Sequence, residues 1–280
     1  MKKLIKLIAI VLALIFCFAL VGCEPTPSDP PPSDPPSGSP SGTPPTYTKA
    51  ELATLYKTVA KSAYSTLGVD EPVLNSPAPV SLSITTDTPE VTDTDDIQTL
   101  KLVMASFVPV INMLGEYYEN PDFVVSDKPV TFNIVNATGT PYTNTKISLL
   151  AKLDQTNNKI YLDFYMTATA FDADYIEYDY CEIGYDFAGT NGVTYFQLLS
   201  KRKMAFISDE FEYVEERLDE DGKCYQTQTQ ASSTLISTID GLYNTFITAK
   251  QSEIQLTTGN FDNEFAKYIA SVMELSMRMQ

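Results

Sequence analysis

Histidine and tryptophan are both missing from the 280 residues of this chain. Without histidine there can be no Ser-His or Cys-His nucleophile pair, no histidine-bearing zinc or iron site, and no general base of the usual kind near neutral pH. Basic residues are also scarce, since 19 lysines and arginines stand against 36 acids and leave a formal net charge of −17. Nucleic-acid binding depends on neutralising phosphates, so this balance argues against a nucleic-acid partner.

Apolar side chains, by contrast, are plentiful. They make up 44% of the chain, and aromatic residues make up 11%. This fraction excludes a wholly disordered chain and is enough to build a sizeable core.

The first 22 residues predict an export signal. Three lysines precede an uninterrupted apolar run over residues 7–21. Its 15 residues are too few for a comfortable membrane span, which needs about 20.

The apolar run ends in Leu20-Val21-Gly22-Cys23, which resembles the lipobox of bacterial lipoproteins. The resemblance implies cleavage before Cys23 and attachment of a diacylglyceryl group to its sulfur, so that Cys23 becomes the mature N-terminus. Two or more acyl chains hold a protein stably where one alone is marginal. We therefore expect the membrane to be a partner through a lipid anchor, with the protein on the extracytoplasmic face. The alternative is an uncleaved signal anchor in which Cys23 is an incidental thiol.

Residues 23–46 predict a lipidated cysteine followed by a tether. Ten of the 18 prolines lie between residues 24 and 46, where no other residue is apolar. Such a segment cannot bury a core and favours polyproline II, whose rise of about 3.1 Å per residue gives a reach of roughly 70 Å. We interpret it as a stalk; a ligand for a proline-recognising module is the rival interpretation.

Residues 47–280 are expected to form one α+β domain. A capping box at Thr48 and Glu51 begins a helix that ends at Gly68. A second helix begins near Asp95 and contains Pro109, which predicts a kink or break near Ala105. A kinked helix can mark a cavity or simply a bent core.

From Pro129 onwards the apolar period changes to two, which predicts strands. Two further helices follow, one capped by Ser232 or Ser233 and one from about Phe261. Short links imply an antiparallel meander of about six to seven strands, with the N- and C-terminal helices packed on one face. The strands are expected at 130–136, 145–153, 159–169, 173–187, 193–200, 203–208, 211–217 and, less distinctly, 80–84 and 223–229.

Aromatic residues gather in the expected sheet, where 14 of the 31 lie between Tyr161 and Tyr213. They can line a pocket for an apolar ligand or stack on a sugar, although strands favour tyrosine and phenylalanine for core packing alone. In outline, a sheet curved over helices resembles the lipoprotein-sorting carriers. That resemblance implies a lipid or other apolar small molecule held in a cavity of several hundred Å³.

Acidic residues form two dense stretches. Oxygen-rich clusters suit Ca²⁺, but neither stretch has the spacing of a known calcium loop, and the simpler interpretation is a solvated strand face. We expect no metal and no cofactor. The stretches contain Asp172, Asp174, Glu177, Asp179, Glu182 and Asp186, and then Asp209, Glu210, Glu212, Glu215, Glu216, Asp219, Glu220 and Asp221.

Cys181 and Cys224 are the cysteines of the domain. In an exported protein they can form a disulfide, and two separate thiols are the alternative. Ser200 and Lys203 match the S-x-x-K pattern of penicillin-recognising serine enzymes, but no S-D-N or K-T-G accompanies them, so we treat the match as chance.

No catalytic constellation is visible in the sequence. We therefore expect a membrane-anchored, extracytoplasmic, non-catalytic domain that binds an apolar small molecule, another ligand or a surface protein. The alternatives are a carboxylate-based hydrolase such as a glycosidase and a structural or adhesive surface protein.

Overall fold

The computed structural model describes residues 47–70, 88–120, 125–134, 142–189, 191–205, 207–227, 230–256 and 268. The signal, the lipobox and the tether lie outside these residues. So do the expected strand at 80–84 and, apart from the helical Tyr268, the expected last helix.

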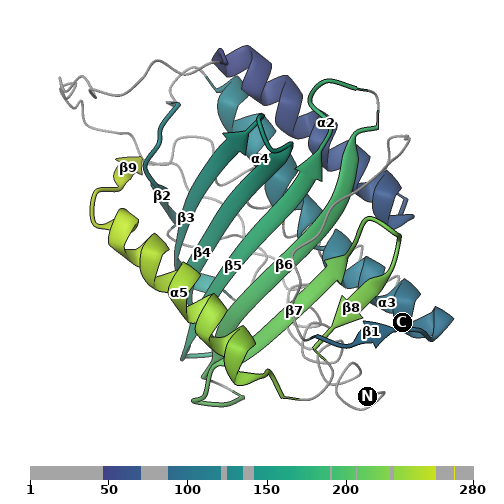
Figure 1. The fold of residues 1–280 in the computed structure, drawn as a ribbon. Helices are drawn as coiled ribbons and strands as arrows, with labels where there is room; N and C mark the ends of the chain where they lie inside the picture. The colour runs from purple at the N-terminus through teal and green to yellow at the C-terminus, as the bar shows by residue number, and fades with distance from the viewer. Residues whose placement is uncertain are drawn as a thin grey trace, which may run out of the picture.

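Among the described residues, nine strands form one sheet in the order β1-β8-β7-β6-β5-β4-β3-β2-β9 (Figure 1). Strands β2 to β8 follow one another as antiparallel neighbours, which confirms the meander, while β9 pairs with β2 in parallel. The strands are β1 Glu90–Val91, β2 Val130–Ile134, β3 Tyr142–Asp154, β4 Lys159–Ala170, β5 Ala173–Tyr185, β6 Val193–Met204, β7 Glu212–Leu218, β8 Cys224–Gln226 and β9 Ile254–Leu256.

The expectation of six to seven strands was too low because the two edge strands are too short to show a period. Strand β1 has two residues and β9 has three. In the opposite direction, the segments expected at 193–200 and 203–208 do not form two strands: β6 contains all of the first and only residues 203 and 204 of the second. Short edge strands leave few unpaired backbone groups for aggregation.

Three helices precede most of the sheet: α2 Lys49–Leu67, α3 Thr94–Ala105 and α4 Val108–Glu119. The capping box at Thr48 and the left-handed Gly68 that ends α2 are both confirmed. The predicted break is also confirmed, since α3 ends at Ala105 and Pro109 lies in the first turn of α4. Residues 94–119 are long and apolar enough to cross a membrane, but they form these two broken helices and are mostly buried in the domain.

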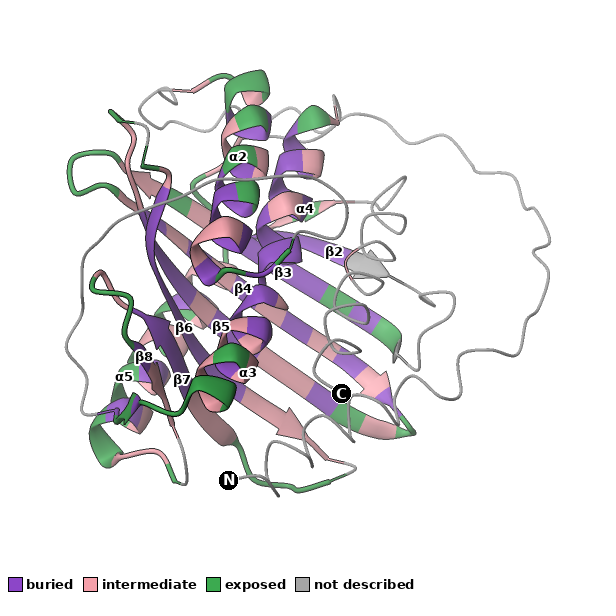
Figure 2. Cartoon of the chain, turned by 90° about the vertical axis from the view of Figure 1, so that its right-hand side faces the viewer, coloured by how far each residue is buried: buried purple, intermediate pink, exposed green. Residues whose placement is uncertain are grey.

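The sheet is covered by helices on both faces, not on one as the sequence predicted. Buried and less buried positions alternate along β4 (Figure 2). Phe164 and Met166 point into the main core with α2, α3 and α4, and we name this side the core face. Helix α5, Ser233–Lys250, packs on the opposite side, the α5 face, and Figure 1 shows it crossing the sheet there.

Helix α5 lies on that side because the sheet offers apolar side chains there as well. Phe246 packs against Leu150 and Tyr178, while Ile239 packs near Leu199. A helix with an apolar stripe must bury it against a matching surface. The stripe was visible in the sequence, but a period alone does not say which face of a sheet will receive it.

A buried lysine fixes the position of α5. The Lys201 Nζ lies 2.6 Å from Asp240 Oδ1 on the helix. It also lies 4.6, 5.3 and 4.5 Å from the ring centroids of Phe211, Tyr213 and Tyr243. Three aromatic faces and a carboxylate around one ammonium hold α5 in register with β6 and β7.

We expect Phe246→Ala to lower the free energy of unfolding by about 3–5 kcal/mol, because it removes a buried ring from α5. Phe246 is 2% exposed, and its ring centroid lies 5.6 Å from that of Tyr178. Urea unfolding measures the change, with the exposed Asn244→Ala as the control on the same helix. Equal stability of the two variants would contradict the packing of α5 on this face.

Candidate functional site

The structure brings the two acidic stretches together around Arg202. Glu177, Arg202 and Glu212 are direct neighbours across β5, β6 and β7. Asp179, beside Ser200, lies one row deeper on the same core face, and Glu216, beside Leu198, lies two rows deeper. We name Arg202, Glu177, Asp179, Glu212 and Glu216 the Arg202 cluster.

The Arg202 cluster extends from a partly exposed margin into the interior. Glu177, Arg202 and Glu212 are half-buried, whereas Asp179 and Glu216 are each only 4% exposed. The interpretation of the acidic stretches as a solvated strand face is therefore wrong for these inner residues. Carboxylates are rarely buried to this extent unless they are paired.

Burial leaves the inner carboxylates with a strong affinity for protons. Burial, together with the nearby Glu177 carboxylate, raises the pKa of Asp179 well above its ordinary value, against the opposing effects of Arg202 and Ser200. Burial also raises the pKa of Glu216, although Arg202 and a hydrogen bond from Gln226 act in the opposite direction. One guanidinium is thus insufficient for the carboxylates that surround it.

Among the described residues, each inner carboxylate accepts a hydrogen bond from one neutral donor. Ser200 Oγ donates to Asp179 Oδ1, and Gln226 Nε2 donates to Glu216 Oε1 over 3.2 Å. Within the part of the chain that the structure describes, no carboxylate lies within 4.0 Å of the Arg202 guanidinium as an ion pair. Glu216 Oε2 and Arg202 Nε are buried without any hydrogen-bond partner among the residues that the structure describes.

A metal site does not fit this arrangement. Among the described residues, no group of three or more aspartate, glutamate or cysteine side chains could hold a metal ion. The positive Arg202 at the centre would also repel a divalent cation. What the cluster can do chemically is exchange protons and attract cationic groups.

A second buried polar network lies on the α5 face, and its charges balance. Glu182 accepts hydrogen bonds from Lys159 Nζ and Tyr195 Oη. Gln197 Nε2 donates to Glu215 Oε1 over 2.8 Å, and Arg217 Nε lies 3.7 Å from the same oxygen. The positive charges of Lys159 and Arg217 offset the negative charges of the two carboxylates, so the network has no net charge for a ligand to neutralise.

Sequence reasoning missed that Glu215 and Glu216 are both buried. They are consecutive in β7 and therefore point to opposite faces of the sheet. The sequence does show two adjacent acids in a strand. This pair indicates two buried carboxylates only once helices are known to cover both faces of the sheet.

Cys181 and Cys224 do not form a disulfide. Both are buried and free, in β5 and β8. Strands β6 and β7 lie between them, so the thiols are separated by three strand spacings, or about 14 Å at about 4.8 Å each. A disulfide requires Cα atoms within about 7 Å, so the alternative of two separate thiols is the correct one.

The S-x-x-K match has no catalytic geometry. Ser200 and Lys203 lie in one strand, β6, at positions of opposite parity, so their side chains point to opposite faces of the sheet. Ser200 instead contacts Asp179 inside the Arg202 cluster.

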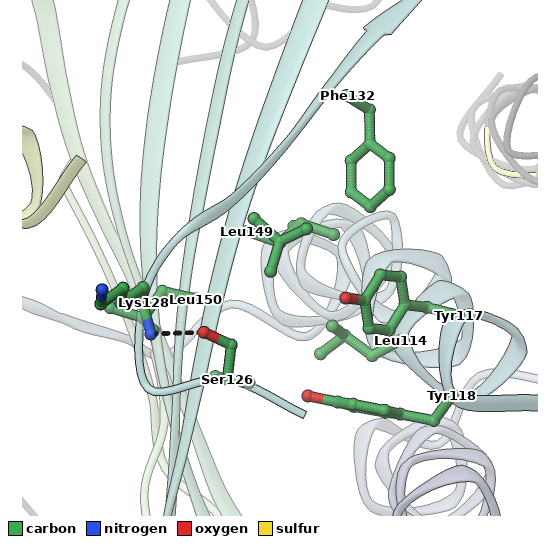
Figure 3. Close-up of a pocket in the computed structure, with 10 residues that line it drawn as sticks. Leu114, Tyr117, Tyr118, Ser126, Lys128, Phe132, Leu149 and Leu150 are labelled. Atoms are coloured by element: carbon green, nitrogen blue, oxygen red, sulfur yellow. Dashed lines mark hydrogen bonds between the residues drawn. The ribbon is translucent and has the colours of Figure 1, made fainter. Parts of the chain in front are cut away.

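One pocket lies between α4 and strands β2 and β3, and Figure 3 shows Tyr117, Tyr118, Leu149 and Ser126 around it. Its cavity volume is about 10 Å³. That is room for about one water molecule and not for an acyl chain. This pocket therefore gives no support to an apolar carrier.

Several of the aromatic residues considered as a ligand surface pack against other aromatic rings of the core or of α5. Phe164 meets Phe107 edge to face at 6.3 Å, and Tyr178 lies 5.4 Å from Tyr243 of α5. These contacts favour core packing over a pocket lining.

Comparison with protein-family models, with curated proteins and with solved structures gives no match for this chain. The chemistry of the site therefore has to be argued from its own geometry.

We expect the thiols of Cys181 and Cys224 to resist maleimide in the native chain, because both are buried and burial raises the pKa of each. After denaturation without a reductant, both should be labelled, as peptide mapping by mass spectrometry would show. Labelling that appears only after reduction would mean that the two cysteines are bonded.

We expect Asp179→Asn to stabilise the domain by about 1–3 kcal/mol near pH 8, because it removes a poorly compensated buried charge. The native pKa of Asp179 is raised, so the stability contributed by the protonated carboxyl is complete below its ordinary pKa of about 3.9. That contribution is lost as the pH rises through the native pKa. The free energy of unfolding of Asp179→Asn, relative to that of the wild type, should therefore increase as the pH rises.

Urea unfolding at a series of pH values measures this difference. The exposed Glu210→Gln, from the same acidic stretch, is the matched control and should track the wild type. A stability difference between Asp179→Asn and the wild type that does not change with pH would contradict the raised pKa.

Proposed function

We propose that this chain is a membrane-anchored extracytoplasmic lipoprotein whose domain binds a ligand or partner without catalysing a reaction. The lipobox ending at Cys23 and the proline-rich segment up to residue 46 support the anchor and the stalk. The observation that carries the binding role is the Arg202 cluster, which combines a partly exposed margin with two almost fully buried carboxylates.

The position of the cluster in the fold suits display away from the stalk. Helix α2, which follows the stalk, contacts the beginning of β6, where Ser62 Oγ accepts a hydrogen bond from the Val193 amide. Arg202 lies nine residues farther along β6, or about 30 Å at about 3.3 Å per residue. The part of α2 around Ser62 and the cluster thus lie toward opposite ends of β6.

Carboxylate-based hydrolysis is the second candidate. The raised pKa of Asp179 beside other carboxylates is the pattern of a general acid with a charged partner. Against it, the pKa of Glu216 is raised as well, so the two inner carboxylates do not divide into a protonated acid and an ionised partner. Turnover of aryl glycosides by the wild type that disappears in Asp179→Asn would favour this candidate over simple binding.

We expect Cys23→Ser to abolish acylation, since the sulfur is the atom that would carry the lipid. Metabolic labelling with a fatty acid and membrane fractionation measure the outcome. The variant should be unlabelled and either released from the membrane fraction or retained as a larger precursor. Cys17→Ser, within the apolar run, is the matched control and should be processed normally. Unchanged processing and acylation of Cys23→Ser would refute the lipobox.

A further inference from the structure

The Arg202 cluster has an excess of negative charge that the domain does not neutralise. Four carboxylates face a single guanidinium on one side of three adjacent strands. The network on the α5 face shows that this chain can balance buried charges, because Lys159 and Arg217 lie beside Glu182 and Glu215 there. The imbalance around Arg202 is therefore a local property and not a general consequence of an acidic sequence.

Of the buried side-chain atoms that have no hydrogen-bond partner among the described residues, two lie inside the cluster, and they have opposite hydrogen-bonding character. Glu216 Oε2 is a buried acceptor, and Arg202 Nε is a buried donor. Glu216 is only 4% exposed, and its charge interacts with Arg202, Glu212 and Asp179. A buried polar atom without a hydrogen bond is costly, so such atoms in a native fold call for an explanation.

A bound group that satisfies both atoms must donate to one and accept from the other. Because the cluster has an excess of negative charge, the group that donates to Glu216 Oε2 should be a cation. A metal ion cannot accept a hydrogen bond from Arg202, and no described group of side chains suits one. An ammonium group beside an oxygen atom meets all of these requirements.

Resting on the proposed binding function, we propose that the Arg202 cluster binds a compact ligand that carries an ammonium group next to an oxygen acceptor. The ammonium donates to Glu216 Oε2, with Asp179 close by, and the oxygen accepts from Arg202 Nε. Glu177 and Glu212, at the half-buried margin, attract the ligand and mark its way in. Basic amino acids and amino sugars share this chemistry.

Isothermal titration calorimetry on the full-length chain in detergent tests the proposal at physiological salt. The probes are L-lysine and D-glucosamine, and their uncharged counterparts are diacetyl-lysine and N-acetylglucosamine. We expect saturable binding of at least one amine and at least about tenfold weaker binding of its acetylated form, because a hydrogen bond to a charged group is lost. The amine that binds identifies the source as an amino acid or an amino sugar.

Three variants separate the site from the general negative charge of the protein. Glu216→Gln removes the orphaned acceptor's charge and should weaken binding about tenfold or more. Arg202→Lys keeps the positive charge but removes the Nε donor, and it should also weaken binding. Glu210→Gln removes the same charge as Glu216→Gln from an exposed position and should leave binding unchanged.

Thermal melting shows whether each variant is folded. If a variant does not fold, the comparison of the amines with their acetylated forms on the wild type still tests the proposal. The proposal is overturned if no amine binds saturably, if the acetylated forms bind as well as the amines, or if folded Glu216→Gln binds like Glu210→Gln. Membrane fractionation of the same preparations reports on the lipid anchor separately. Loss of the anchor would contradict the proposed localisation, whereas loss of amine binding alone would contradict only the ligand.

Discussion

Helices on both faces of a nearly continuous antiparallel sheet leave the polar side chains of the central strands little access to water. Successive residues of a strand point to opposite faces of the sheet. When helices cover both faces, two residues that are adjacent in the sequence are therefore both buried. Glu215 and Glu216 are the clearest case, with exposures of 0% and 4%. The polar groups of β5, β6 and β7 must therefore find partners within the domain or acquire them from outside.

The two faces meet this constraint in different ways. On the α5 face, Glu182 and Glu215 lie beside cations, and Lys201 is enclosed by aromatic rings and Asp240. On the core face, Arg202 has several carboxylates around it, and none of those in the described part of the chain lies within ion-pair distance of its guanidinium. Buried charges that balance one another cost the fold little stability, whereas a buried cluster with an unbalanced charge destabilises the fold. A fold retains such a cluster more readily if it does something that a packed core cannot do.

Local signals in the sequence were sufficient for the elements that depend on local physics. The capping box at Thr48 and the break before Pro109 both appear where the spacing predicted them. The face chosen by α5 and the separation of Cys181 from Cys224 were not predictable, because each depends on how distant strands are ordered. The burial of Asp179 and Glu216 was missed for the same reason. An acidic strand suggests a solvated face until a second layer of helices is known to cover it.

Proton affinity and the proposed ligand affinity of the Arg202 cluster have a common physical cause. Burial favours any positive charge near Asp179 and Glu216, whether it arrives as a proton on a carboxyl or as an ammonium on a ligand. The two therefore compete, and acidification should displace the amine while stabilising the empty domain. Amine binding in turn should stabilise the domain most where the carboxylates are ionised. Burying these carboxylates without enough cations destabilises the free domain. A bound ammonium would reduce that unfavourable free energy, and this reduction would favour ligand binding.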